Sequence, residues 1–239
     1  MYLPPLFRED RLEVQHEVIR RHPLGLLLTA GPGGLQANAI PFLVKPERSE
    51  FGTLQAHLAK ANLQWRELEA VEECLVVFQG PDAYVTPSWY ATKQESGKVV
   101  PTWNYVAVHA WGRPRVIEDA GWLREQIGAL TDSQEDHFEE PWSVSDAPDA
   151  FIAGQIKGII GLEIPIARIE GKWKVSQNRP EADRAGVIAG FTALGEDARE
   201  MAALVAERCR DYAKGRLAVE ALLFDFDANL LGRARTADW

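Results

Sequence analysis

Two segments rich in aromatic and amide side chains give the first indication of chemistry in this chain. They are GPDAYVTPSWY, residues 80–90, and VPTWNYVAVHAWG, residues 100–112. Tryptophan and tyrosine bury a large area and keep one polar group, so packing is the usual role of any single one of them. Interleaved with Thr86, Ser88 and Asn104, they also suit a planar ring with hydrogen-bonding edges. A flavin, which carries an anionic phosphate at its tail in the mononucleotide, is such a ligand.

A place for a phosphate lies between a predicted strand and a predicted helix, in QAHLAKANLQW, residues 55–65. His57 stands at the end of the strand, and Asn62 is the expected N-cap of a helix over residues 61–73. Lys60 lies between them among small residues. The free N–H groups and positive dipole at a helix start attract anions. Taken alone the signal is weak, because lysines in such turns commonly serve solubility.

The return strand of a predicted hairpin, QANAIPF, carries a third candidate. Asn38 stands among small and apolar neighbours and offers an amide edge. Pro41 restricts the strand to a sheet edge or a bulge, where backbone groups are exposed to a ligand. The alternative is that Pro41 only protects the edge from aggregation.

Several familiar catalytic patterns are absent from the sequence. It contains no GxxxxGK[ST], GxGxxG or GxSxG motif. His16 and His22 are six residues apart, not the four that a zinc-binding helix requires. No protein nucleophile or metal site can be proposed, so redox chemistry would have to come from a cofactor.

The charge of the chain limits its partners. A net charge of −9 argues against a nucleic-acid binder that uses its whole surface. A local basic segment remains at residues 168–179, and residues 131–149 hold seven acids, which we expect to form a solvated loop.

The compartment is expected to be the cytoplasm. We see no signal peptide and no apolar run long enough to span a membrane. Cys74 and Cys209 stand in no metal-binding spacing, and Cys74, inside the apolar run CLVVF, is expected to be a buried free thiol.

Hydrophobic periodicity predicts a mainly β, α+β chain. The predicted strands cover residues 24–30, 35–44, 52–59, 73–80, 103–119 and 160–169, and the helices cover 9–23, 61–73, 119–134, 198–213 and a segment capped by Asp146. Because successive strands are joined by hairpins, we expect an antiparallel, closed or partly closed barrel with helices packed outside.

Five segments occur in the same order as in PaiB-like proteins: MYLPPLF, HLAKANLQW, GPDAYVTPSWY, VPTWNYVAVHAWG and IEGKWKVSQNR. The chain resembles this family of FMN-binding negative transcriptional regulators over residues 1–209, and residues 210–239 form a C-terminal extension. The resemblance implies an FMN-binding split β-barrel similar to that of pyridoxamine phosphate oxidases, with a helical C-terminal region. It also implies a homodimer with FMN at the subunit interface.

The same resemblance implies a set of FMN-binding residues. The phosphate would lie near His57, Leu58, Ala59, Lys60 and Asn62, and Asn38, Ala39 and Ile40 would follow the ring and ribityl chain. Trp89, Trp103 and Asn104 belong to the aromatic segments that would line the cleft. Gln177, Asn178 and Arg179 would close it from the partner chain.

Three functions remain open. The first is a flavin-binding regulator that acts on DNA or through a regulatory protein partner. The second is an FMN-dependent oxidoreductase in which His109, Tyr105 or Trp103 contacts the substrate. The third is a dimer without FMN that binds haem or another planar ligand, with His57 or His109 as an axial ligand.

Overall fold

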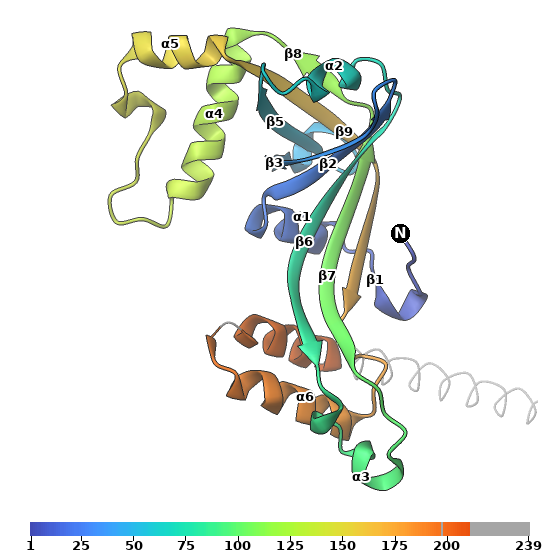
Figure 1. Ribbon diagram of the computed structural model, residues 1–239. Coiled ribbons are helices and arrows are strands. Elements are labelled where there is room, and N and C mark those ends of the chain that lie inside the picture. The colour runs from blue at the N-terminus through green and yellow to red at the C-terminus, as the bar shows by residue number, and fades with distance from the viewer. Residues whose placement is uncertain (197, 211–239) are drawn as a thin grey trace, which may run out of the picture. The chain divides into compact units, whose positions relative to one another are not determined.

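The computed structural model describes residues 1–196 and 198–210 (Figure 1). The strands are β1 (Arg8–Glu9), β2 (Leu24–Gly31), β3 (Gly34–Pro41), β4 (Leu43–Lys45), β5 (Thr53–Ala59), β6 (Cys74–Val85), β7 (Thr102–Gly112), β8 (Arg115–Ile117) and β9 (Ile159–Lys174). The helices are α1 (Leu12–Arg21), α2 (Gln64–Leu68), α3 (Thr92–Ser96), α4 (Ala120–Glu135), α5 (Asp149–Lys157) and α6 (Glu181–Ala193). Short 3-10 turns are η1 (Pro5–Phe7), η2 (Pro46–Arg48), η3 (Pro87–Trp89) and η4 (Val144–Asp146).

The described strands form one sheet with the strand order β3-β2-β6-β7-β9-β5-β4. Strands β1 and β8 pair with β9 outside this path. The pairs β2–β3, β2–β6, β4–β5 and β5–β9 are all antiparallel. The two ends of the path, β3 and β4, are not hydrogen-bonded neighbours among the described strands, so the barrel is split. Pro41 ends β3 at this open edge, as its missing N–H predicts. The predicted fold class, a mainly β split barrel with helices, is confirmed.

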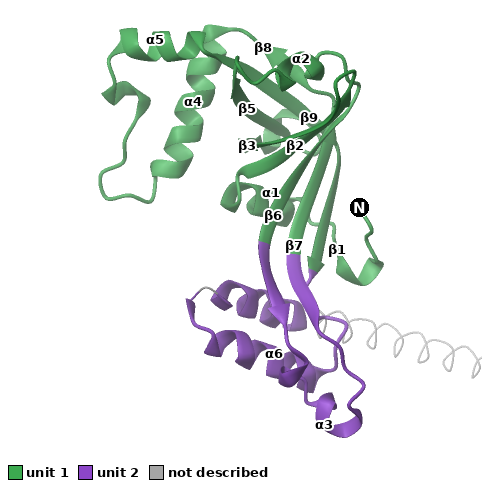
Figure 2. Ribbon diagram, viewed as in Figure 1, with its two compact units in different colours: residues 1–80, 106–173 green, residues 81–105, 174–239 purple. Residues whose placement is uncertain are grey.

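The chain divides into two compact units (Figure 2). Unit 1 holds residues 1–80 and 106–173, and unit 2 holds residues 81–105 and 174–239. The boundaries fall within β6 and β7 and near the end of β9. The extension predicted from residue 210 lies almost wholly outside the described residues and stays a prediction.

The core of unit 1 follows from period-two alternation in β9 and β5. Ile160, Leu162 and Ile164 are each at most 1% exposed, as the pattern of β9 predicts. Leu54 and Leu58 of β5 are buried in the same way. Each such side chain contributes about 1.5–3 kcal/mol on burial. The opposite face of β5 therefore remains for Gln55 and His57.

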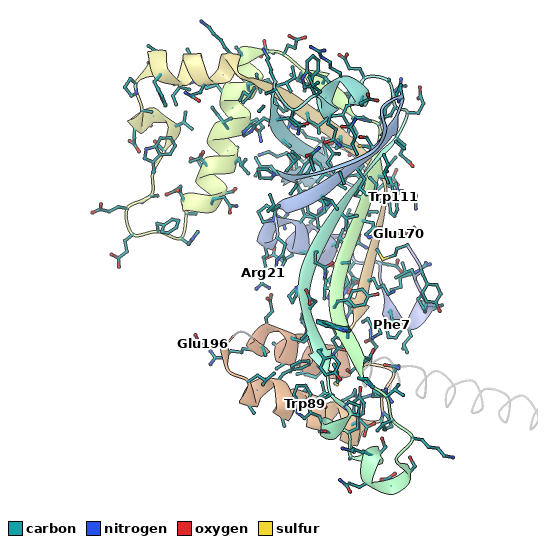
Figure 3. All side chains as sticks on the ribbon, viewed as in Figure 1. Phe7, Arg21, Trp89, Trp111, Glu170 and Glu196 are labelled. Carbon is teal, nitrogen blue, oxygen red and sulfur yellow. The ribbon has the colours of Figure 1, made fainter. Side chains whose placement is uncertain are left out.

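The core of unit 2 forms where Trp89 meets α6 (Figure 3). The Trp89 ring lies edge-to-face with Phe191, with 5.0 Å between ring centroids. A Cβ at Gly190 would stand 2.3 Å from the Trp89 indole, and one at Gly186 would stand 1.9 Å from the Trp89 carbonyl oxygen. The two glycines thus let the tryptophan approach the helix closely. Trp89 was predicted as a cofactor residue, and in the structure it packs on α6.

Two predicted helix starts are wrong. The N-cap of α2 is Leu63, with helical φ and ψ, and not Asn62, although the Asn62 Oδ1 accepts from the Gln64 N–H. The helix predicted over residues 61–73 shortens to α2 because the chain must turn after buried Leu68 to enter β6. Asp146 closes a capping box with Ser143 in η4, and α5 begins only after Pro148. The proline keeps the residue before it out of the helical region.

We predict that Gly186→Ala destabilises the protein by about 1–3 kcal/mol, because a backbone carbonyl cannot move away as a side chain can. Urea unfolding followed by tryptophan fluorescence measures the effect. Gly154→Ala in α5 is the matched control, because its Cβ would meet no described atom within 4 Å. Helix propensity should make that control neutral or up to about 1 kcal/mol more stable. Equal midpoints for Gly186→Ala and the parent would contradict the close contact.

Candidate functional site

The turn from β5 into α2 is fixed by local hydrogen bonds. The Asn62 N–H donates to the Ala59 carbonyl at 2.9 Å, and the Trp65 Nε1–H donates to the Lys60 carbonyl at 3.0 Å. The Lys60 N–H donates to the Gly158 carbonyl at 2.9 Å, which ties the turn to the end of α5. The backbone of Lys60 is therefore held while its exposed ammonium has no partner within the described chain. Leu58, by contrast, points into the core.

Gln64 connects this turn to the hairpin. Its side chain is fully buried, and its Nε2 donates to the Leu27 carbonyl and the Thr29 hydroxyl, each at 3.2 Å. Its Oε1 accepts from the Asn38 Nδ2 at 2.9 Å. One amide therefore joins α2, β2 and β3, and it places Asn38 next to the β5–α2 turn. Sequence reasoning found Asn38 but missed Gln64, since nothing local distinguishes it from a surface glutamine.

The outer face of the β2–β3 hairpin is apolar and exposed. Ala39 pairs with Leu26, which is 39% exposed, and Leu24 beside Pro41 is 64% exposed. Ile40 points the other way and is buried. The small Ala39 side chain keeps this face flat. An exposed apolar face of this kind favours contact with a planar ring or a partner chain over exposure to solvent.

His57 lies under α4 on the side of β5 away from the core. Its Nδ1 lies 2.8 Å from the Oε1 of Gln126, and Gln126 is only 3% exposed. Next to this pair, Lys45, Arg48, Gln55, Trp122, Glu125, Gln126 and Ala129 line a cavity of about 100 Å³. Gln126 was not predicted, because only the packing of α4 on β5 brings it to His57.

A second group of polar contacts gathers in unit 1 around Trp111 and Glu170 (Figure 3). The Arg168 guanidinium lies 3.5 Å from the centroid of the Trp111 ring and donates to Glu170 at 2.8 Å. The His109 ring centroid lies 5.5 Å from that of Trp111. Burial lowers the pKa of His109, so the imidazole is neutral at pH 7 and can act as a neutral donor or acceptor.

Unit 2 presents an exposed aromatic pair. Tyr84 is 48% exposed and Trp103 is 55% exposed, and their rings meet edge-to-face at 6.0 Å. The Lys174 ammonium donates to the Thr102 hydroxyl and to the Trp103 carbonyl, and it lies 6.0 Å from the centroid of the Tyr105 ring. Both aromatic segments of the sequence therefore contribute to one partly exposed surface within this unit.

The remaining predicted residues of unit 2 surround a strained turn. Ser176 has a φ of 64°, a left-handed conformation that costs a residue with a Cβ. Its hydroxyl exchanges hydrogen bonds with the buried Asn104 amide at 3.0 and 3.1 Å. Gln177 accepts from the Val175 N–H at 2.7 Å, and the Arg179 guanidinium lies 4.4 Å from the centroid of the Tyr90 ring. Asn178 is exposed.

The predicted residues thus form two sets. Unit 1 brings together Asn38, Ala39, Ile40, His57, Leu58, Ala59, Lys60 and Asn62, and unit 2 holds Trp89, Trp103, Asn104, Gln177, Asn178 and Arg179. Each set stays a prediction for FMN contacts. The unit 1 set offers an unpaired cation for a phosphate and an amide at Asn38, while Ala39 belongs to the opposite, outer face of β3.

Other kinds of site receive no support from the described residues. Within residues 1–196 and 198–210, no group of three or more His, Cys, Asp or Glu side chains could hold a metal ion. None of the helices in that part of the chain is long and apolar enough to cross a membrane. Both cysteines are free thiols, and burial raises the pKa of Cys74 to about 12, so its predicted burial is confirmed.

Comparison with known protein families decides the classification. The family described as "Putative FMN-binding domain" matches residues 1–168. The chain belongs to this FMN-binding family. The "Protease synthase and sporulation protein PAI 2" of Bacillus subtilis is 31% identical, over 88% of this chain and 99% of that protein. The PaiB-like resemblance and the cofactor prediction, FMN, are thereby confirmed.

Two further relatives of this chain are fungal. An uncharacterised protein of Emericella nidulans is 39% identical, over 87% of this chain and 97% of its own length. An uncharacterised protein of Saccharomyces cerevisiae is 33% identical, over 63% of this chain and 100% of its own length. Relatives of this chain therefore occur in a bacterium and in fungi.

Solved structures show the same fold at low identity. The FAD and haem binding protein of Mycobacterium smegmatis superposes with a TM-score of 0.54 at 16% identity, covering 77% of this chain and 80% of that one. The flavocytochrome Anf3 of Azotobacter vinelandii gives a TM-score of 0.52 at 16% identity, covering 75% of each chain.

We predict that Gln64→Leu lowers the free energy of unfolding by about 1–3 kcal/mol, because it leaves the Leu27 carbonyl and the Asn38 amide without partners. Urea denaturation measures the change. Gln155→Leu on the exposed face of α5 is the control, and its effect should stay within about 0.5 kcal/mol. Similar small effects for both variants would show that Gln64 does not hold the hairpin to α2.

Proposed function

We propose that this protein is an FMN-binding homodimer that regulates gene expression, as PaiB-type proteins are expected to do. The observation that carries the proposal is the family match over residues 1–168, together with a relative at 31% identity named for protease synthesis and sporulation. The free Cys74 and Cys209 thiols favour a reducing compartment, which we take to be the cytoplasm.

In the proposed site, Lys60 binds the FMN phosphate. Its exposed ammonium has no protein partner in the described chain, while its own N–H and carbonyl are fixed by Gly158 and Trp65. Asn38, positioned by Gln64, offers an amide to the polar edge of the ring. Helix α2 has only five residues, so the side chain of Lys60, and not a helix dipole, supplies most of the attraction. FMN itself supplies any redox chemistry.

The homodimer would form on the outer face of the β2–β3 hairpin. Leu24, Leu26 and Leu35 are exposed there. Leu24 and Pro41 also border an open groove of about 530 Å³ whose other walls include Leu130 and Trp142. A monomer seldom leaves such a continuous apolar surface in water, and a second copy of the chain would cover it.

Regulation through a protein partner is favoured over direct contact with DNA. The basic segment 168–179 was the candidate for phosphate contacts, and its cations are engaged within the chain. Arg168 stacks on Trp111, Lys172 is 8% exposed and Arg179 stacks on Tyr90. A gel shift in varied salt separates the two routes, because direct DNA binding must strengthen at low salt.

We predict that Lys60→Met weakens FMN binding about tenfold or more, because a charge-assisted hydrogen bond to the phosphate is lost. Quenching of FMN fluorescence during titration measures the dissociation constant. Lys157→Met, an exposed lysine at the end of α5, removes the same charge and should leave FMN affinity unchanged. A wild-type protein that fails to bind FMN would overturn the proposed function.

We predict that Leu24→Asp with Leu26→Asp converts the dimer to a monomer, because the apolar face would then bury two unpaired carboxylates. Sedimentation velocity measures the mass of the species. Leu194→Asp, at a leucine that is 65% exposed in unit 2, is the control and should remain dimeric. A wild-type monomer at micromolar concentration would contradict the dimer.

A further inference from the structure

The cavity under α4 is too small for a flavin ring and has its own chemistry. Its volume is about 100 Å³, which corresponds to roughly three water molecules or one small ion. The last residue of β4, the turn η2, the start of β5 and the middle of α4 form its walls. None of its lining residues belongs to the predicted FMN set.

Gln126, in one wall of the cavity, carries a buried donor without an acceptor in the described part of the chain. The Oε1 of Gln126 takes the hydrogen bond with His57, and the Nε2 of Gln126 has no partner in the described part of the chain. Gln126 is 3% exposed, so bulk water does not solvate this N–H group. A buried unpaired donor is costly, and a small turn of the Gln126 side chain toward the cavity would let a ligand oxygen satisfy it.

The charged lining favours an anion. The Lys45 ammonium has no ion pair or hydrogen bond to any described residue. The Nη1 of Arg48 lies 3.4 Å from the Oε2 of Glu163. That oxygen also accepts from Gln55 at 3.0 Å, so the carboxylate has other donors. The one acid in the lining, Glu125, is exposed and can turn toward solvent. Lys45, Arg48 and Gln126 therefore bring donors to the lining, and Glu125 is the one carboxylate among the lining residues.

The floor of the cavity is rigid. Trp122 lies against Gly161 of β9, where a Cβ would stand 2.5 Å from the indole ring. This contact fixes α4 on the sheet and therefore fixes Gln126, which lies one helical turn further along the same face.

We propose that this cavity binds a small anion through one carboxylate or phosphate group, whose oxygens accept from the Gln126 Nε2, Lys45 and Arg48. A cationic ligand would face Lys45 and leave the Gln126 donor unpaired, so the chemistry selects an anion. The site is separate from the proposed FMN site and does not depend on it. The two are linked through His57, because the amide that meets the anion also holds the His57 ring.

Isothermal titration calorimetry at constant ionic strength tests the proposal with inorganic phosphate and with acetate as probes. We expect saturable binding of at least one probe with one site per chain. Lys45→Met should weaken it about tenfold or more, while Lys157→Met, with the same charge change on exposed α5, should leave it unchanged. Absence of saturable binding for both probes, or equal weakening in the two variants, would overturn the proposal.

The link to His57 gives a second readout. In protein labelled with ¹³C-histidine, the His57 ring resonance should shift on addition of the binding anion, and Gln126→Leu should abolish that shift. An unchanged His57 resonance at saturation would place the anion elsewhere and overturn the assignment.

A further comparison separates this site from FMN binding. The Lys60→Met variant should lose FMN affinity and retain anion binding, and saturating FMN should not displace the anion. Competition between FMN and phosphate that Lys45→Met abolishes would show that the cavity takes the FMN phosphate, which would overturn the separate site. A protein that binds the anion but no FMN would refute only the proposed function.

Discussion

Strand β9 must find hydrogen-bond partners along sixteen residues, and most of the described fold follows from that requirement. Its first half pairs with β5 and β8, and Gly171 and Lys172 pair with β1. A strand that long would otherwise leave a row of backbone groups without partners. Because β5 is held on one side of it, the turn that carries Lys60 and the face that carries His57 are both fixed in position.

The elements that could be predicted from the sequence are those whose signal is local. Alternation of Ile160, Leu162, Ile164 and Ile166 predicts a strand buried on one face, and the structure buries all four. The glycines of GPGG predict the hairpin, and Gly34 does take a φ of 91°. Helix starts were less predictable: Asn62 bonds the Gln64 N–H as a capping residue would, yet the N-cap of α2 is Leu63.

The part of the candidate site that sequence reasoning missed depends on contacts between distant segments. Gln64 meets residues about 26 to 37 positions away, and Gln126 meets His57 from 69 positions away. A glutamine in a polar helix has no local mark that separates it from a solvated one. Their structural roles can be recognised only from the structure, which shows that both side chains are buried and which of their amide atoms have hydrogen-bond partners. The residues that hold the site in shape were thus less predictable than those expected to contact FMN.

The contact of Trp122 with Gly161 also has an evolutionary consequence. A β-carbon at position 161 would overlap the indole, so these two positions cannot change independently while α4 stays on β5. Among relatives that keep this helix in place, a larger residue at 161 should be accompanied by a smaller one at 122. Covariation between a strand glycine and a helix tryptophan would then mark family members that retain the cavity, even where Lys45 or Arg48 has been replaced.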